Sequence, residues 1–207
     1  MLKKGNKKVI QGWVMYDWAN SVYSLVISTA IFPIFYEAQT KSVYAEQIGE
    51  SLENINAHDV AVPFFGYNVS PSVIYSMVIS VSFLIVIFLS PILSGIADYT
   101  GNKKRFLQFF CYFGAFFCMS LFFFDAHYME LSMIPFLMAS IGFWCSLVFY
   151  NAFLPEIASA ENQDDISARG FIMGYIGSVI LLIICIILTQ GEDLLGIQNL
   201  NSSLTKY

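Results

Sequence analysis

Residues 179–188 read Val-Ile-Leu-Leu-Ile-Ile-Cys-Ile-Ile-Leu, and residues 83–89 read Phe-Leu-Ile-Val-Ile-Phe-Leu. Neither run alternates between polar and apolar side chains, as the strands of a membrane β-barrel do. Helices and closed barrels are the two structures that satisfy their own backbone hydrogen bonds in lipid. The two runs therefore predict apolar α-helices and not strands.

The whole chain shares this apolar character. Of its 207 residues, 57% are hydrophobic, 12% are charged and 20 residues are Phe. A soluble domain usually has about a quarter of its residues charged, so this chain has too little charge to cover a surface that faces water. The composition excludes a soluble domain, a disordered chain and a disulfide-rich secreted scaffold, and it indicates a protein solvated by lipid.

Cysteine, histidine and net charge point to no bound metal, cofactor or nucleic acid. The 4 cysteines lie inside apolar runs, where a thiol behaves as a small hydrophobe. His58 and His127 lie far apart and outside those runs, and no metal-ligand spacing occurs. The net charge of -5 argues against a nucleic-acid surface. We therefore expect no metal, no cofactor and no nucleic-acid partner.

Five apolar stretches are long enough to cross the bilayer, which takes about 20 helical residues. They predict an all-α membrane protein with five transmembrane helices in a bundle over residues 13–189. A short segment, residues 1–12, precedes the bundle and a tail, residues 190–207, follows it. The loops are residues 37–70, with a short helix near Val43 to Leu52, and residues 98–105 and 155–170. The predicted spans are Trp13–Tyr36, Val73–Ala97, Phe106–Phe124, Ser132–Leu154 and Phe171–Thr189.

The distribution of cations predicts the orientation in the membrane. Eight of the 10 Lys and Arg residues lie before the first span, between the second and third, or between the fourth and fifth. Only Lys41 and Lys206 lie in the opposite loops. Because cytoplasmic loops carry the excess of Lys and Arg, the N-terminus and the loops 98–105 and 155–170 are expected in the cytoplasm, and the tail outside.

The first predicted span carries a polar stripe. At about 100° per residue, its polar residues fall on one face of an otherwise apolar helix. An ionisable group inside a span is costly and normally faces a bundle interior or a water-filled path. Asp17 is therefore either a proton or cation site in a solute path or the anchor of a structural salt bridge. The stripe consists of Asp17, Asn20, Ser21, Ser24 and Ser28.

The loop between the second and third spans predicts a tight, charged turn. Residues 94–105 read Ser-Gly-Ile-Ala-Asp-Tyr-Thr-Gly-Asn-Lys-Lys-Arg. Gly101 can adopt the positive φ that ends a helix. Asp98 at a helix C-terminus and cations at a helix N-terminus oppose the helix dipoles, so both need partners. We expect Asp98 to pair with Arg105 or Arg169. The candidate cytoplasmic gate comprises Asp98, Gly101, Lys103, Lys104, Arg105, Glu156 and Arg169.

The fourth and fifth spans add polar and small residues. Pro155 cannot donate to the carbonyl of Asn151, so the Asn151 side chain either repairs the helix locally or contacts a solute on the same face as Trp144. At the start of the fifth span, small residues share one helical face, which predicts close helix packing and not a phosphate-binding loop. They are Gly170, Gly174, Gly177 and Ser178.

The charged turn resembles a signature of the major facilitator superfamily of transporters. That signature, Gly-x-x-x-Asp-x-x-Gly followed by Arg or Lys, lies between the second and third helices of the superfamily. Ser94 replaces its first glycine, and Gly95 comes one position late. The matching residues are Asp98, Gly101, Lys103 and Lys104.

Longer segments are similar to one branch of the superfamily, which includes the yeast vacuolar amino-acid effluxer linked to autophagy and its bacterial relatives. Residues 12–21 read Gly-Trp-Val-Met-Tyr-Asp-Trp-Ala-Asn-Ser, and residues 150–156 read Tyr-Asn-Ala-Phe-Leu-Pro-Glu. The resemblance implies a secondary transporter of the bacterial cytoplasmic membrane. It implies twelve helices in two halves with a small-molecule solute site between them. Efflux or exchange of amino acids or small metabolites, coupled to protons or another ion, is the expected activity.

The same resemblance implies that the chain is the N-terminal portion of a transporter. Five spans are present where the family has twelve, so the missing C-terminal helices would come from the same or another chain. The fourth span lacks the arginine of many proton-coupled members, which leaves Asp17 as the acidic coupling candidate. We expect no enzyme, although two alternatives stay open: a non-transporting membrane subunit, and a membrane-embedded enzyme acting on lipid head groups with Asp98, Glu156, Asp164 and Asp165.

Overall fold

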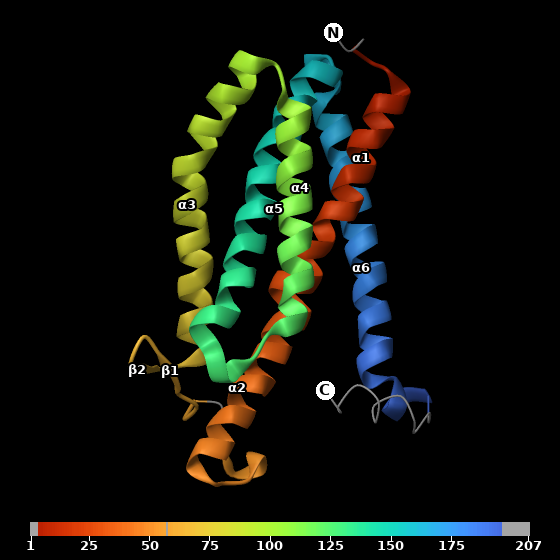
Figure 1. The fold of residues 1–207 in the computed structure, drawn as a ribbon. Helices are drawn as coiled ribbons and strands as arrows, with labels where there is room; N and C mark the ends of the chain where they lie inside the picture. Colours follow the sequence, from red (N-terminus) through yellow and green to blue (C-terminus); the bar gives the residue numbers. More distant parts are fainter. Residues whose placement is uncertain (1–3, 57, 196–207) are drawn as a thin grey trace. The chain divides into compact units, whose positions relative to one another are not determined.

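The computed structural model describes residues 4–56 and 58–195, with side chains up to residue 188. The chain divides into two compact units. Residues Ile34–Ala160 form the first, called here the α2–α5 unit. Residues Gly5–Pro33 and the segment from Glu161 onward form the second, the α1–α6 unit. Figure 1 shows the elements of both, and each unit is described by itself.

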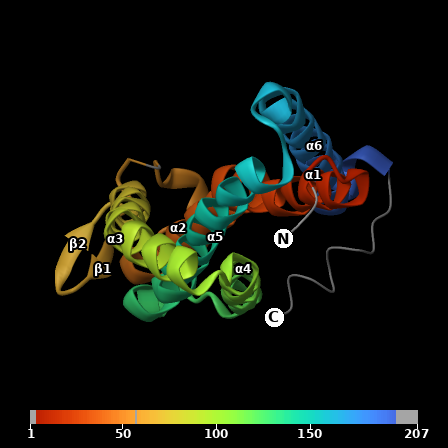
Figure 2. The ribbon, with the colours of Figure 1, turned by 90° about the horizontal axis from the view of Figure 1, so that it is seen from above.

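The α2–α5 unit is built around α5. This helix packs along α4 and also against α3, whereas α3 and α4 make few contacts with each other (Figures 1 and 2). The unit contains α2 (Phe32–Ile48), α3 (Pro71–Thr100), α4 (Lys103–Ser120) and α5 (Met129–Ile157), the strands β1 (Val62–Phe64) and β2 (Tyr67–Val69), and the short helices Leu52–Asn54, Leu121–Phe123 and Ala126–Tyr128.

Two glycines and a cluster of aromatic rings join α4 to α5. A Cβ atom built on Gly142 would lie 2.6 Å from the Cα of Gly114, so the two backbones are nearly in contact. Phe106 and Phe110 stack on Phe149, with ring centroids 5.4 and 5.9 Å apart. Small residues allow such close approach between helices in a membrane. The pair of glycines therefore sets the distance between the two helices, and the rings fill the space beside it.

A short hairpin lies between α2 and α3. Its strands pair antiparallel, with Val62 opposite Val69, and Val62 is fully buried. Phe65 and Gly66 form the turn with φ of 47° and 83°, the left-handed pair that matches the twist of a two-residue hairpin. The backbone N–H of Phe65 donates to Oε1 of Glu130 over 2.8 Å. The hairpin is thereby fixed to the first turn of α5.

The α1–α6 unit is a pair of helices packed side by side (Figures 1 and 2). α1 (Lys7–Val22) begins at Asn6, whose side chain accepts from the backbone N–H of Lys8 over 3.0 Å and so caps the helix. A π-helical segment, η1 (Tyr23–Ile31), continues α1 directly. α6 (Gln163–Leu195) follows the short helix Ala160–Asn162.

The π-helical segment widens the first spanning helix at a run of hydroxyl residues. The Thr29 hydroxyl donates to the carbonyl of Ser24, five residues earlier, over 2.6 Å. The N–H of Phe32 likewise bonds the carbonyl of Ile27. Pro33 follows and has no N–H for the carbonyl of Thr29. Short π-helical insertions of this kind are often found at functional sites.

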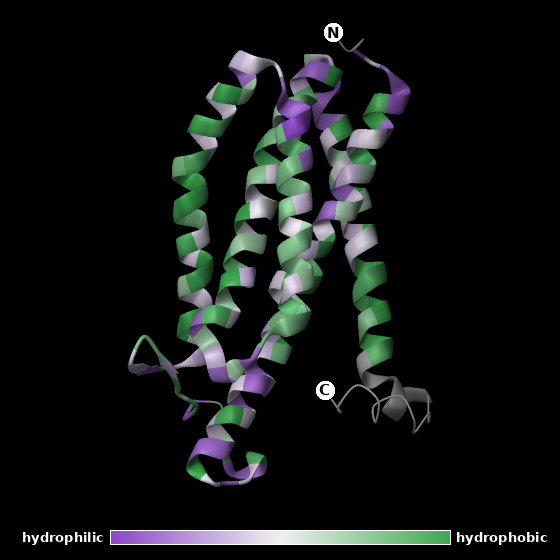
Figure 3. Ribbon diagram, in the orientation of Figure 1, coloured by the Kyte–Doolittle hydropathy of each residue, from purple (hydrophilic) through white to green (hydrophobic). Residues whose placement is uncertain are grey.

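The structure confirms the expected all-α class, with five helices in the described part of the chain that are long and apolar enough to cross a membrane. Figure 3 shows mostly apolar residues along α3 and α6, with polar residues gathered near the helix ends. The first helical stretch is longer than expected. It continues through α2 to Ile48, so residues 37–48 of the expected loop are helical, and the separate short helix near Val43 to Leu52 is instead the end of α2. Of the expected tail, residues 196–207 lie outside the described residues.

Candidate functional site

Asp17 is a buried acidic residue in the middle of α1. Only 7% of its surface is exposed. The Ser21 side chain, one turn further on, hydrogen-bonds to its carboxyl group. The Ser24 hydroxyl donates to the carbonyl of Ser21 over 3.0 Å, and Ser28 is half-buried. The stripe thus combines one acidic group with hydroxyls that mostly bond to their own helix.

Two of the buried polar atoms of the α1–α6 unit that have no hydrogen-bond partner within the described part of the chain lie on different helices. They are Nδ2 of Asn20 on α1 and Oγ of Ser178 on α6. Leaving such groups unsatisfied in a low-dielectric interior costs about 1–3 kcal/mol each. A bound solute or water that accepts from Asn20 and bonds Ser178 would remove this cost, so both atoms are candidate ligand contacts.

The small residues of α6 form one buried face. Gly170, Gly174, Gly177 and Ser178 are all buried. A Cβ atom on Gly174 would clash with the Ser21 hydroxyl, and one on Gly177 would lie 2.6 Å from the Trp18 ring and 2.9 Å from its carbonyl. These glycines therefore allow α6 to lie directly on the α1 face that carries the polar stripe.

Lys103 pairs with two carboxylates at one end of the α2–α5 unit. Its ammonium lies 2.9 Å from Oδ1 of Asp98 and 2.7 Å from Oε1 of Glu156. Gly101 ends α3 with φ of 64°, and this reversal places the first residue of α4 beside the last turn of α3. One lysine thereby connects the α3–α4 turn, residues 98–105, to the C-terminal end of α5.

Within the α2–α5 unit, the partner of Asp98 is thus Lys103 and not the expected Arg105. Arg169 pairs with Asp165 on its own helix, over 2.8 Å. Lys104 and Arg105 are exposed and form no ion pair within the residues that the structure describes. Within this unit, the ion pairs bring together Lys103, Asp98 and Glu156 of the candidate gate residues, with Gly101 shaping the turn.

The other predicted residues lie apart from this cluster. Trp144 is half-buried and packs on Phe83 of α3, with ring centroids 4.9 Å apart. Asn151 is exposed on α5. Gly95, one position after the Ser94 that replaces the signature's first glycine, has open space around it, so none of the described helices packs closely there. Among the described residues, no group of three or more His, Cys, Asp or Glu side chains could hold a metal.

Comparison with known proteins identifies the family. The family described as "Vacuole effluxer Atg22 like" matches residues 5–199, which is most of the chain. This chain belongs to the Atg22-like effluxer family. No solved structure matches it.

Two relatives of this Atg22-like chain come from very different organisms. One, described as the uncharacterized MFS-type transporter YxiO of Bacillus subtilis (strain 168), is 39% identical over 197 residues, covering 94% of this chain and 41% of the relative. The other, autophagy-related protein 22 of Coccidioides immitis (strain RS), is 23% identical over 187 residues, covering 80% of this chain and 31% of the relative. The chain thus spans less than half the length of either relative.

These matches confirm the expected family and fold class. The Atg22-like chain is a multi-pass membrane protein of the major facilitator type, with five apolar helices in the described residues. The Bacillus relative is described as a transporter and the family as an effluxer, which points away from an enzyme. The charged turn and the α1 stripe therefore belong to a membrane protein of this family.

Sequence reasoning missed a helix contact and a pocket in the Atg22-like structure. One is the contact between Gly114 and Gly142, for which isolated glycines inside apolar helices are a recognisable signal. The other is a pocket beside α2 that includes Glu37 and Lys41. No sequence signal pointed to the pocket, because residues 37–48 were expected in a loop.

Proposed function

We propose that this chain is part of a secondary transporter that moves amino acids or small metabolites across the bacterial cytoplasmic membrane. The observation that carries the proposal is the buried Asp17 in a polar stripe on a membrane-spanning helix. An acidic group at that depth is costly unless it serves a polar path or an ion. Asn20 and Ser178 add two buried polar atoms that a solute could satisfy.

Asp17 is the proposed coupling residue. A carboxyl group in a dry environment can take up a proton when one side of the membrane supplies it and release the proton towards the other side. Ser21 holds the carboxyl group through a hydrogen bond that either protonation state can make. The proposal therefore assigns proton exchange to Asp17 and orientation of its carboxyl group to Ser21.

The orientation follows from the cation distribution. Eight of the 10 basic residues fall on one side of the predicted spans, which supports a cytoplasmic N-terminus and a cytoplasmic α3–α4 turn. The Lys103 cluster would then hold the cytoplasmic ends of α3, α4 and α5 together, as a gate must when that side is closed. The transport cycle also needs helices beyond those of this chain, because the relatives that it resembles are more than twice as long.

The test is uptake by liposomes under an imposed pH gradient. The chain is reconstituted with the portion of the Bacillus relative that it does not match, and the substrate is a mixture of radiolabelled amino acids. We expect saturable accumulation, and we expect Asp17→Asn to abolish accumulation against the gradient while membrane insertion stays normal. Asp164→Asn, an exposed acidic residue of α6, is the matched control and should accumulate normally.

Two results would contradict the proposal. Normal pH-dependent accumulation by Asp17→Asn would make Asp17 a structural residue. Saturable uptake by the 207-residue chain alone would show that no further helices are needed. Absence of uptake in every combination, with a metal-dependent change in lipid head groups, would favour the membrane-embedded enzyme.

A further inference from the structure

A pocket of about 430 Å³ lies beside α2 at the end of the α2–α5 unit far from the Lys103 cluster. The pocket and the Lys103 cluster lie at the two ends of α3, since Pro71 lines the pocket and Asp98 belongs to the cluster. A 30-residue helix is about 45 Å long, so most of the length of α3 separates the pocket from the cluster. Its volume is within the range of small-molecule sites, about 300–1,000 Å³.

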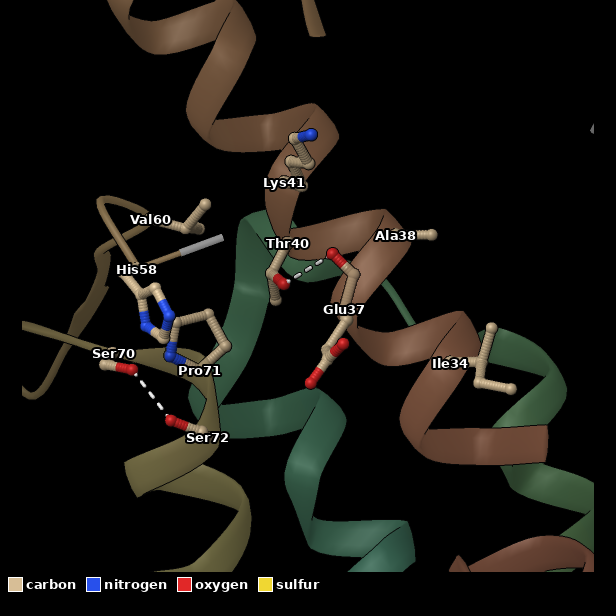
Figure 4. Close-up of a pocket in the computed structure, with 10 residues that line it drawn as sticks. All are labelled: Ile34, Glu37, Ala38, Thr40, Lys41, His58, Val60, Ser70, Pro71 and Ser72. Carbon is tan, nitrogen blue, oxygen red and sulfur yellow. Dashed lines mark hydrogen bonds between the residues drawn. The ribbon is translucent and has the colours of Figure 1, made fainter. Parts of the chain in front are cut away.

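The pocket contains two opposite charges that do not pair with each other. Glu37 and Lys41 lie one turn apart on α2, the spacing at which Glu and Lys normally form an ion pair on a helix. Neither side chain has an ion pair or a hydrogen bond within the described residues. Figure 4 shows the Glu37 and Lys41 side chains directed away from each other, on either side of Thr40.

Thr40, which also lines the pocket, bonds to neither charged group. It is fully buried, and its hydroxyl donates to the carbonyls of Tyr36 and Glu37, at 2.9 and 3.0 Å. Its hydroxyl is therefore directed to the helix backbone and to neither charged group. The carboxylate of Glu37 and the ammonium of Lys41 stay available to a molecule in the pocket.

The opposite wall offers hydrogen-bonding groups from the segment before α3. The Ser70 and Ser72 hydroxyls are 2.9 Å apart and share one hydrogen bond, which leaves one of their two hydrogens free to donate. His58 also lines the pocket, and Figure 4 shows its ring beside Pro71 and Ser70. These groups suit an oxyanion placed near the Lys41 ammonium.

We propose that this pocket binds a zwitterionic group, with its ammonium on Glu37 and its oxyanion on Lys41. Two sources carry this chemistry: a free amino acid, and the phosphoethanolamine head group of a membrane lipid. The site stands on its own geometry and does not depend on the proposed transport function. It is also separate along the chain from the α1 stripe around Asp17.

Ligand binding can be measured by NMR from the ring signals of the two histidines of the chain. His58 lines the pocket, whereas His127 lies outside it, so the His127 ring signals are an internal control in an NMR titration. The full chain is placed in phospholipid-free detergent micelles, and His58→Gln assigns the signals. The probes are L-alanine and phosphoethanolamine as zwitterions, L-alanine methyl ester as a cation and N-acetyl-L-alanine as an anion.

The expected result is a saturable shift of the His58 signals alone, with zwitterions binding about tenfold or more tighter than either singly charged probe. Glu37→Gln should remove the advantage of the zwitterions while N-acetyl-L-alanine binds as before. Lys41→Gln should also remove that advantage, while L-alanine methyl ester binds as before. Glu53→Gln, at an exposed residue of the segment between α2 and β1, should bind like the unmodified chain. No His58 shift with any probe, or equal affinities for all four, would overturn the proposal.

Titrations in nanodiscs of two lipid compositions then distinguish a free amino acid from a lipid head group as the ligand. If the head group is the occupant, phosphatidylethanolamine should compete with L-alanine and raise its apparent Kd, whereas phosphatidylglycerol should not. If a free amino acid is the occupant, the Kd should be the same in both lipids. Either outcome supports a zwitterion site and names its ligand, and an unsaturable response in both lipids would overturn it.

Discussion

At the scale of single residues, Lys103 is the charge on which the α3–α4 turn depends. It is largely covered, with 21% of its side chain exposed, and it lies between two carboxylates. Without it, Asp98 and Glu156 would be left as neighbouring like charges. We expect Lys103→Gln to lower the melting temperature in detergent, whereas Lys104→Gln, the exposed neighbour, should have little effect.

A double-mutant cycle tests each half of this cluster. Because both carboxylates are partly exposed, with 62% of Asp98 and 44% of Glu156 accessible, each coupling to Lys103 should be no more than about 1 kcal/mol. The same cycle between Asp98 and Arg105 should give additive effects. Additivity for both Lys103 pairs would show that the contacts contribute nothing to stability.

Sequence alone could identify these charges but not their pairing. Residues 103–105 are three consecutive cations at the start of α4, and successive residues on a helix point in directions about 100° apart. Which one faces Asp98 and Glu156 depends on the rotation of α4 about its axis. The packing of Gly114 against Gly142 sets that rotation, and the charge pattern holds no information about it.

Asp125 gives a residue-level prediction on pH. The backbone N–H of His127, and then its ring, hydrogen-bond to the Asp125 carboxylate and hold the pKa of that carboxyl below its usual value. The stabilisation is therefore present above the unfolded pKa, about 3.9, and is lost as the pH falls through the lower folded value. Hydrogen exchange of the His127 amide should speed up, beyond its intrinsic pH dependence, only in that acidic range.

Asp125→Asn is the control for that measurement. The amide oxygen can still accept from the His127 N–H but cannot titrate. The pH step should disappear in this variant. A step of the same size in both proteins would assign the change to another group.

At the scale of elements, the α4–α5 contact is the most sensitive place to add volume. Gly142→Ala would put a methyl group 2.6–2.7 Å from the backbone of Gly114, which cannot move aside as a side chain can. The helices must separate, so we expect a loss of about 1–3 kcal/mol, measured as a fall in melting temperature. Gly95→Ala should be neutral or slightly stabilising, because Gly95 has open space and alanine favours helix. Equal stability of the two variants would contradict this interpretation of the packing.

The spanning helices were the elements that sequence predicted well. Apolar runs of bilayer length are a strong signal, so all five spans correspond to long helices in the described residues. The continuation of helix through Glu37 and Lys41 to Ile48 was not predicted, because polar residues outside the hydrocarbon carry no such signal. The π-helical segment was also missed, since it depends on Pro33 and on hydroxyl contacts that a periodicity pattern does not show.

At the scale of the whole molecule, the orientation gives a prediction across the membrane. Tyr67 in the hairpin and Tyr99 near the end of α3 are 75% and 94% exposed, at opposite ends of that helix. In a background with all 4 cysteines replaced by serine, we expect Tyr67→Cys to react with a membrane-impermeant maleimide in intact cells. Tyr99→Cys should react only after permeabilisation. The reverse pattern would invert the orientation, and labelling of both in intact cells would show that α3 does not cross the membrane.

The hydrogen bond between Phe65 and Glu130 has a consequence for synthesis on the ribosome. It joins residues 65 positions apart, and at about 5–20 residues per second Glu130 is added roughly 3–13 s after Phe65. During that interval the nascent hairpin has only its own two strands, which are marginally stable alone. Two further helices, α3 and α4, must enter the bilayer before the hairpin is fixed. A protease pulse during translation should therefore cut residues 62–69 in arrested chains that end before α5, and should spare them once α5 has been inserted.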